Sequence, residues 1–133
     1  MFCDDKILGK PANKDEARRM LQLLSGKTHC VISGICIMGK GKKVCESVKT
    51  DVVFRELTGD EIEGYISTNE PYDKAGGYGI QSVAGAFITE IIGDYYNVVG
   101  LPVSRLVSVL KNEFGYDALK NLFFENGDRN GQK

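Results

Sequence analysis

The sequence has few of the residues from which metal sites and disulfide frameworks are built. It contains one histidine, His29, and four cysteines, none of which belongs to a C-x-x-C pair, so a zinc site is not expected. Met1 is not followed by a basic region and an apolar core, so the sequence predicts no secretory signal peptide and a cytoplasmic location. In a chain of this size without such a signal, a disulfide framework is not expected either.

The cysteines and the histidine are instead expected to be structural. Cys30 and Cys36 have the same parity along a predicted strand, so we expect them to pack as small apolar groups. His29 has no partner in a metal-binding pattern, and for such an isolated histidine a structural role is expected ahead of a ligand or catalytic role.

The sequence also lacks an excess of charge of one sign and a long apolar run. Its 17 basic and 18 acidic residues give a formal net charge of -1, which provides no electrostatic footprint for nucleic acid. No apolar run approaches the length of a membrane span. Apolar residues make up 42% of the chain, and its 133 residues suit one globular domain with a buried core. Neither nucleic acid nor membrane is expected as a partner.

Capping patterns and apolar spacing predict three helices. Asn13 and Thr58 are each followed three residues later by a glutamate, which is the capping-box pattern. The first cap predicts a helix over residues 13–25, and the second predicts a short helix directly after Thr58. A third helix is predicted over residues 102–114, between a proline that suits a helix start and a glycine that suits a helix end.

Two segments rich in β-branched and apolar residues predict strands. Residues 28–38 read as a largely buried strand, and residues 44–56 alternate between two faces. Val48, Thr50, Val52 and Phe54 lie on one face, and Lys49, Asp51, Val53 and Arg55 lie on the other. A lysine-rich turn separates the two strands, so the sequence predicts a long antiparallel hairpin.

The C-terminal part of the chain is less regular. A short helix over residues 78–84 and a strand over residues 86–92 are expected, although the second segment also fits a helix. Residues 117–124 are expected to add one or two helical turns. A single domain would then span residues 1–124, and the polar tail at 125–133 is expected to be disordered.

A glycine-rich stretch at residues 70–81 reads Glu-Pro-Tyr-Asp-Lys-Ala-Gly-Gly-Tyr-Gly-Ile-Gln. Glycine backbone can leave N–H groups free to point at an anion, and Lys74 adds a point charge suited to phosphate. The amide of Gln81 can read the edge of a base. The stretch matches neither the Walker pattern nor the dinucleotide fingerprint, and on spacing alone a tight structural turn explains it better.

Five separate stretches match one protein family in the same order along the chain. One is the glycine-rich stretch, and another is the strand pattern of Thr50, Phe54 and Arg55. Together the five resemble the Maf family, the septum-formation-inhibitor-like nucleotide pyrophosphatases, over about residues 5–114. The other three are Ile-Leu-Gly-Lys-Pro at residues 7–11, Leu-Ser-Gly-Lys-Thr-His at 24–29 and Gly-Asp-Tyr-Tyr-Asn-Val-Val-Gly-Leu-Pro at 93–102.

The resemblance implies an α/β fold related to that of the inosine-triphosphate pyrophosphatases, with a mixed sheet, a long antiparallel hairpin and flanking helices. It also implies a reaction, the hydrolysis of a nucleoside triphosphate between its α and β phosphates. The products are a monophosphate and pyrophosphate, and the cofactor is a divalent cation, Mg²⁺ or Mn²⁺. The form of the glycine-rich stretch resembles the branch that prefers dTTP and UTP. A housecleaning role, the removal of modified nucleotides, is commonly proposed for this family.

The resemblance carries over to particular residues. Lys10 and Lys74 would face the phosphates, Gly76 and Gly77 would belong to the phosphate site, and Gln81 would help to select the base.

Other residues of the motifs keep alternative explanations. For Lys27 and Arg55, a surface ion pair explains the residue at least as well as a ligand role. Tyr78 could stack on a base, although packing is the simpler account. The metal ligands stay unassigned, with Glu70 and Asp73 as candidates.

Members of this family begin with a strand and a Ser-x-Ser-Pro-Arg-Arg loop, followed by an Ala-Asp-Thr motif whose acid is taken as the general base. Both motifs would lie before Met1, so the resemblance implies a domain that lacks its N-terminal strand and helix, with the catalytic residue unassigned. Asp4 and Asp5 align with a turn and not with that acid. Two functions therefore stay open, a pyrophosphatase or a non-catalytic module that binds a nucleotide or a protein partner. Uncovered apolar surface would also suit a homodimer.

Overall fold

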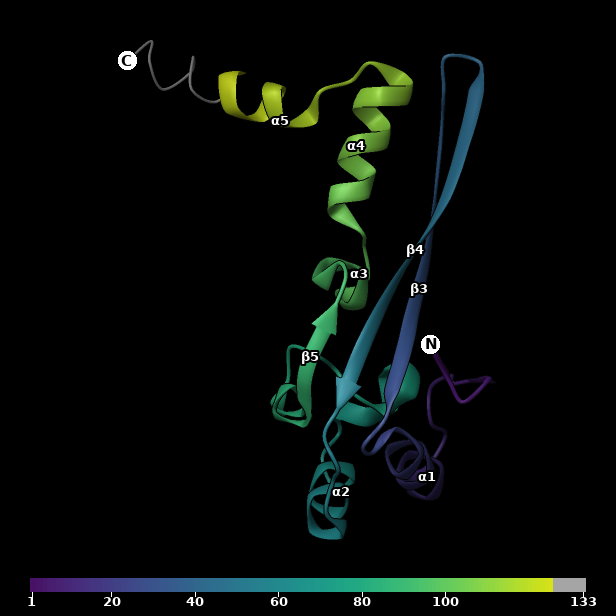
Figure 1. The fold of residues 1–133 in the computed structure, drawn as a ribbon, viewed down its shortest axis with the longest axis vertical. Coiled ribbons are helices and arrows are strands. Elements are labelled where there is room, and N and C mark those ends of the chain that lie inside the picture. The colour runs from purple at the N-terminus through teal and green to yellow at the C-terminus, as the bar shows by residue number, and fades with distance from the viewer. Residues whose placement is uncertain (126–133) are drawn as a thin grey trace.

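The computed structural model describes residues 1–125, which form one five-stranded sheet flanked by helices (Figure 1). The predicted α/β architecture with a long antiparallel hairpin is confirmed. All pairings among the described strands are antiparallel, so the sheet is not mixed. The strand order is β2-β1-β3-β4-β5. The strands are β1 (Phe2–Cys3), β2 (Lys6–Ile7), β3 (Thr28–Gly39), β4 (Lys42–Phe54) and β5 (Ile88–Ile92).

The two capping patterns mark helix starts as predicted. The Asn13 side chain accepts a hydrogen bond from the Glu16 N–H, and Thr58 forms a complete capping box with Glu61. Gly115 ends the helix after Pro102 in a left-handed conformation, as predicted. None of the described helices has the length and apolar character needed to cross a bilayer. The helices are α1 (Lys14–Leu24), α2 (Gly59–Ile66), α3 (Tyr95–Val99), α4 (Val103–Phe114) and α5 (Ala118–Lys120), with a π-helical turn at Asn121–Glu125.

The β3–β4 hairpin runs along most of the length of the molecule (Figure 1). Its tip is a two-residue turn in which Lys40 and Gly41 both have positive φ, 49° and 74°. Such turns match the right-handed twist of the strands that they join. Strands β1 and β5 pair with the hairpin only along its inner part, β1 at Cys30 and β5 along residues 51–54. The outer part is therefore a two-stranded ribbon within the described structure.

The main core lies between the inner part of the sheet and helices α1 and α2. The predicted division of β4 into two faces is confirmed, and the face with Val52 and Phe54 is the buried one, at 0% and 2% exposure. Helix α1 contributes side chains at helical spacing. The core is completed by residues of the glycine-rich stretch and its neighbours. Its buried members include Ala17, Leu21, Leu24, Ile62, Tyr65, Ile66, Tyr78, Ala84 and Phe87.

A second, smaller apolar cluster holds α4 against the outer hairpin. It joins Ile35 of β3 to Val109 and Phe114 of α4, with partly buried side chains around them. The tip adds a hydrogen bond from Lys40 Nζ to the Phe114 carbonyl at 2.8 Å.

Two expectations about the cysteines were wrong, the absence of a disulfide and the packing of Cys36 as a free side chain. Cys36 does not pack as a small apolar group, because it forms a disulfide with Cys45 across the hairpin. Cys30 lies opposite Asp51 and is only half-buried. Parity along one strand does not show which residue lies opposite on the next. Counting outward from the two-residue turn at Lys40 and Gly41 would have paired the two cysteines.

The prediction of a helix over residues 78–84 was also wrong. Residues 78–82 are irregular, and a 3₁₀ helix follows at Val83–Phe87, capped by Ser82. The strand after it is present as β5. Helix α3 was not predicted, although Asp94 caps it by accepting from the Tyr96 and Asn97 N–H groups. The predicted turns after residue 117 are present. The tail predicted to be disordered falls mainly on residues 126–133, which lie outside the described residues.

Candidate functional site

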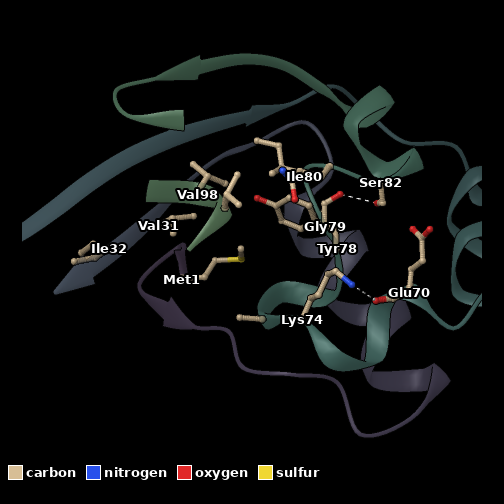
Figure 2. Close-up of a pocket in the computed structure, with 13 residues that line it drawn as sticks. Met1, Val31, Ile32, Glu70, Lys74, Tyr78, Gly79, Ile80, Ser82 and Val98 are labelled. Carbon is tan, nitrogen blue, oxygen red and sulfur yellow. Dashed lines mark hydrogen bonds between the residues drawn. The ribbon is translucent and has the colours of Figure 1, made fainter. Parts of the chain in front are cut away.

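The glycine-rich stretch forms one wall of a cavity of about 620 Å³ (Figure 2). The stretch folds as two 3₁₀ turns, Glu70–Asp73 and Ala75–Gly77, and then crosses to Ser82. The opposite walls come from β3 and from α3, so three distant segments enclose the space. The lining residues outside the glycine-rich stretch are Met1, Val31, Ile32, Ser82, Val98 and Val99.

Two glycines of the predicted site have a conformational role. Gly76 and Gly77 have φ of +76° and +78°, which side-chain-bearing residues rarely adopt. Their N–H groups donate to the carbonyls of Gly9 and Lys74, both at 3.0 Å. The reasoning that these N–H groups are free to point at an anion was therefore wrong. The turn instead joins the glycine-rich stretch to the segment that carries Lys10.

The third glycine makes room for the lysine. A Cβ placed on Gly79 would lie 2.6 Å from Lys74 Cε and 2.8 Å from Cδ, so the lysine stem crosses directly over the Gly79 backbone. Lys74 Nζ then donates to Asp73 Oδ1 at 2.9 Å. It also donates to the Glu70 carbonyl at 3.4 Å (Figure 2). Sequence reasoning did not assign Gly79 a role, although its position within the triple-glycine stretch was visible.

Charges of both signs gather at this end of the cavity. The hydrogen bond from Lys74 lowers the pKa of Asp73, and the positive charge of Lys10 lowers it further. The pKa of Lys74 is raised in return by its bond to Asp73. Lys10 is exposed and does not line the cavity itself. The fold thus brings the two predicted phosphate lysines to a shared carboxylate.

Gln81 also lines the cavity. Its side chain is exposed, and among the described residues it has no hydrogen-bond partner. The amide therefore presents one acceptor and one donor group to whatever occupies the space.

A buried tyrosine–histidine pair supports the wall behind the cavity. The Tyr78 hydroxyl and His29 Nε2 lie 2.6 Å apart, and both rings make edge contacts with Phe54. Tyr78 is 4% exposed, so packing describes it better than an open stacking platform. Burial lowers the pKa of His29 to about 4, so the imidazole is neutral at pH 7. The structural role expected for His29 agrees with this environment.

The other cations of the motifs form ion pairs outside the cavity lining. Lys27 pairs with Asp4, which lies in the turn between β1 and β2. Arg55 makes a two-pronged pair with Glu61. Of the two explanations considered for Lys27 and Arg55, the structure agrees with the surface ion pair and not with a ligand role.

The two carboxylates considered as metal ligands differ in their surroundings. Asp73 is already bonded to Lys74, whereas Glu70 lines the cavity and its buried Oε2 has no hydrogen-bond partner in the described structure. Within residues 1–125, no group of three histidine, cysteine or acidic side chains is placed to hold an ion. Glu70 fits a Mg²⁺ or Mn²⁺ site in which most ligands come from phosphate and water.

The family model described as Maf-like protein matches residues 1–113 of the chain. The chain belongs to the Maf-like protein family. It is 56% identical over 108 residues to a dTTP/UTP pyrophosphatase of Bacillus cereus strain ATCC 14579, covering 81% of this chain and 56% of that protein. It is 55% identical over 114 residues to a dTTP/UTP pyrophosphatase of Bacillus anthracis, covering 86% of this chain and 59% of that protein. This Maf-like chain therefore spans little more than half the length of these relatives.

Proposed function

We propose that this chain is a Maf-like nucleoside triphosphate pyrophosphatase of the dTTP/UTP type, which forms a monophosphate and pyrophosphate. The observation that carries the proposal is the arrangement at the cavity, where a lysine held over Gly79 faces the same space as Gln81, whose amide has no hydrogen-bond partner among the described residues. A triphosphate requires positive charge, and a base requires a donor and an acceptor on one edge. The two Bacillus relatives are dTTP/UTP pyrophosphatases, which supports the choice of dTTP and UTP.

Each residue of the proposed site has a separate part. Lys74 would exchange its bond to Asp73 for a phosphate oxygen, and Lys10 would add a second positive charge from the same side. Gly76 would keep the two lysine-bearing segments together through its bond to the Gly9 carbonyl, and Gly77 would close the turn through its bond to the Lys74 carbonyl. Gln81 would contact the base. The Glu70 carboxylate would hold a divalent cation, which when bound supplies further charge to stabilise the leaving pyrophosphate.

A variant of Lys74 tests the proposal. Pyrophosphate release from a panel of nucleoside triphosphates, with Mg²⁺ and with Mn²⁺, is expected to be highest with UTP or dTTP. Lys74→Met keeps a stem over Gly79 and removes the charge, and we expect it to lower release by roughly 10²-fold. Lys111→Ala, on the outer helix α4, is the matched control and should leave release unchanged. Equal release from Lys74→Met and the parent chain would reject this role for Lys74.

A second candidate function is nucleotide binding without turnover. It is favoured by one observation, that Glu70 is the only carboxylate among the described cavity-lining residues. One carboxylate cannot both hold a cation and accept a proton from the attacking water. Calorimetric binding of UTP that depends on Lys74, together with no pyrophosphate release at high protein concentration, would select this alternative.

A further inference from the structure

The Cys36–Cys45 disulfide lies on an exposed face of the outer hairpin. The two cysteines are directly opposite each other in the β3–β4 ladder, with a Cα–Cα distance of 4.1 Å. This spacing is that of a non-hydrogen-bonded pair, in which facing side chains come closest. Ile35 and Val44, next to the cysteines along the strands, point toward α4. Because side chains alternate along a strand, both sulfurs point away from α4, and both cysteines are exposed.

The surroundings leave the disulfide open to a small molecule. On the same face, the neighbouring cross-strand pair is Gly34 with Ser47. A Cβ placed on Gly34 would meet nothing within 4 Å, so the strand surface next to the disulfide on that side is open in the described structure. The pair on the other side is Met38 with Lys43. Within the described residues Lys43 makes no ion pair, so its ammonium group is available to attract an anionic reagent.

The other two cysteines are placed differently. Cys3 is 2% exposed, its Sγ lies 3.9 Å from the Leu23 carbonyl, and burial raises its pKa. Burial in apolar surroundings makes a thiol a poor nucleophile. Cys30 is half-buried at the point where β3 pairs with β1, opposite Phe2. The exposed pair is therefore the part of the molecule most accessible to thiol chemistry.

We propose that Cys36 and Cys45 form a reversible thiol–disulfide exchange site for anionic low-molecular-weight thiols such as glutathione. A thiolate attacks one sulfur, forming a mixed disulfide and releasing the other cysteine as a thiolate. A second small thiolate then attacks the small-molecule sulfur of the mixed disulfide. The protein disulfide is reduced by two electrons to two thiolates, which take up the two protons that the small thiols lost, and the two small thiols are oxidised to one small disulfide. The reverse reaction consumes that small disulfide.

Exchange at this site would alter the outer hairpin and leave the main core intact. With the bond closed, the pairing of the ribbon is fixed covalently across the hairpin. With the bond open, only the ladder and the small cluster with α4 hold the ribbon. The inner hairpin has the main core and β5 in addition.

The proposal can be tested by equilibrating the whole chain with buffers of graded reduced-to-oxidised glutathione ratio. Acid quenching, thiol alkylation and peptide mapping then report each cysteine. We expect Cys36 and Cys45 to gain the label together, at a ratio within the glutathione range. The single variants Cys36→Ser and Cys45→Ser should each trap a glutathione adduct on the remaining cysteine. Cys30→Ser should leave the midpoint unchanged.

Three results would overturn the proposal. The bond could resist every glutathione ratio, which would make it purely structural. It could fail to form even in fully oxidised glutathione, which would contradict the cross-strand pairing. Glutathione could also accumulate on Cys30 in preference to Cys36 and Cys45, which would show that exposure does not select the site.

Discussion

His29 is an ionisable group that the fold keeps uncharged. Its ring is 2% exposed between Phe54 and Tyr78, and its Nδ1 has no hydrogen-bond partner among the described groups. Burial lowers its pKa most, the N-terminal ammonium lowers it further, and Asp51 opposes both. The proton that His29 binds readily in the unfolded chain is therefore excluded from the native protein until the pH is much lower.

This lowered pKa predicts that the folded protein loses stability over a defined range of acidic pH. Since the pKa of His29 falls from 6.5 to about 4 on folding, the unfolded state binds more protons between these values. Stability should therefore fall as the pH drops from about 6.5 and level off below about 4. At about 1.4 kcal/mol per pKa unit, the loss is about 3 kcal/mol. Urea denaturation across this range measures it.

His29→Gln provides the control, because glutamine can still bond to the Tyr78 hydroxyl and does not titrate. The slope between pH 6.5 and 4 should disappear in this variant. Arg55 lowers the pKa of the salt-bridged Glu61 to about 2. Protonation of Glu61 therefore affects stability below its ordinary pKa of 4.5, at lower pH than protonation of His29. An unchanged slope in His29→Gln would assign the acid sensitivity to other groups.

At the scale of single elements, the buried side-chain amide of Asn97 joins α3 to both strands of the hairpin. Asn97 Nδ2 lies 2.9 Å from the Val48 carbonyl, 3.0 Å from Thr50 Oγ1 and 3.2 Å from the Val31 carbonyl. The residues that follow it, Val98 and Val99, line the cavity. The amide thus sets the position of a cavity wall through the backbone of both long strands.

Removing this amide should destabilise the protein more than the small size of the change suggests. Asn97→Ala leaves buried acceptors without their donor, and we expect it to destabilise the protein by about 2–3 kcal/mol. Tyr96→Ala, at an exposed position of the same helix, should stay within about 0.5 kcal/mol of the parent. Denaturant midpoints of the two variants give the comparison. Similar midpoints would mean that α3 is held by its apolar contacts alone.

Elements whose limits are set by nearby residues could be predicted from the sequence. The caps at Asn13 and Thr58 are satisfied within three residues, so their patterns are visible locally. The 3₁₀ helix at Val83–Phe87 was mistaken for an earlier α-helix because Ser82, and not apolar spacing, sets its start.

Contacts between distant segments were harder to predict. The family resemblance selected Lys10 and Lys74, and nothing in the spacing of residues 64 positions apart indicates that the charges of both act on Asp73. The lysine stem over Gly79 and the bonded N–H groups of Gly76 and Gly77 depend on three-dimensional packing, so they could not be predicted.

At the scale of the whole molecule, two separate apolar clusters divide the hairpin. The main core covers its inner part, and the cluster of Ile35, Val109 and Phe114 covers its outer part. Regions with few buried apolar contacts open at lower free energy than the rest of a protein. The outer ribbon and α4 should therefore behave as one locally opening unit.

Phe114→Ala tests this division. In reducing buffer, amide hydrogens of the outer hairpin should exchange at least about 30-fold faster in the variant, which corresponds to about 2 kcal/mol of local stability. Amides of residues 50–54, which pair with β3 and β5, should change little. Phe87→Ala, in the main core, should instead accelerate exchange in both parts. Uniform acceleration in Phe114→Ala would mean that the two clusters unfold together.

The long ladder of the hairpin also restricts which other folded states the chain can reach. Sliding one strand by a single residue would exchange the faces of a whole strand, turning Val52 and Phe54 outward and lysines inward. The nearest competing arrangement therefore loses the main core and the α4 cluster at once, with no intermediate slip that keeps either. A hairpin of this length thus widens the energy gap between the native state and its closest misfolded neighbour.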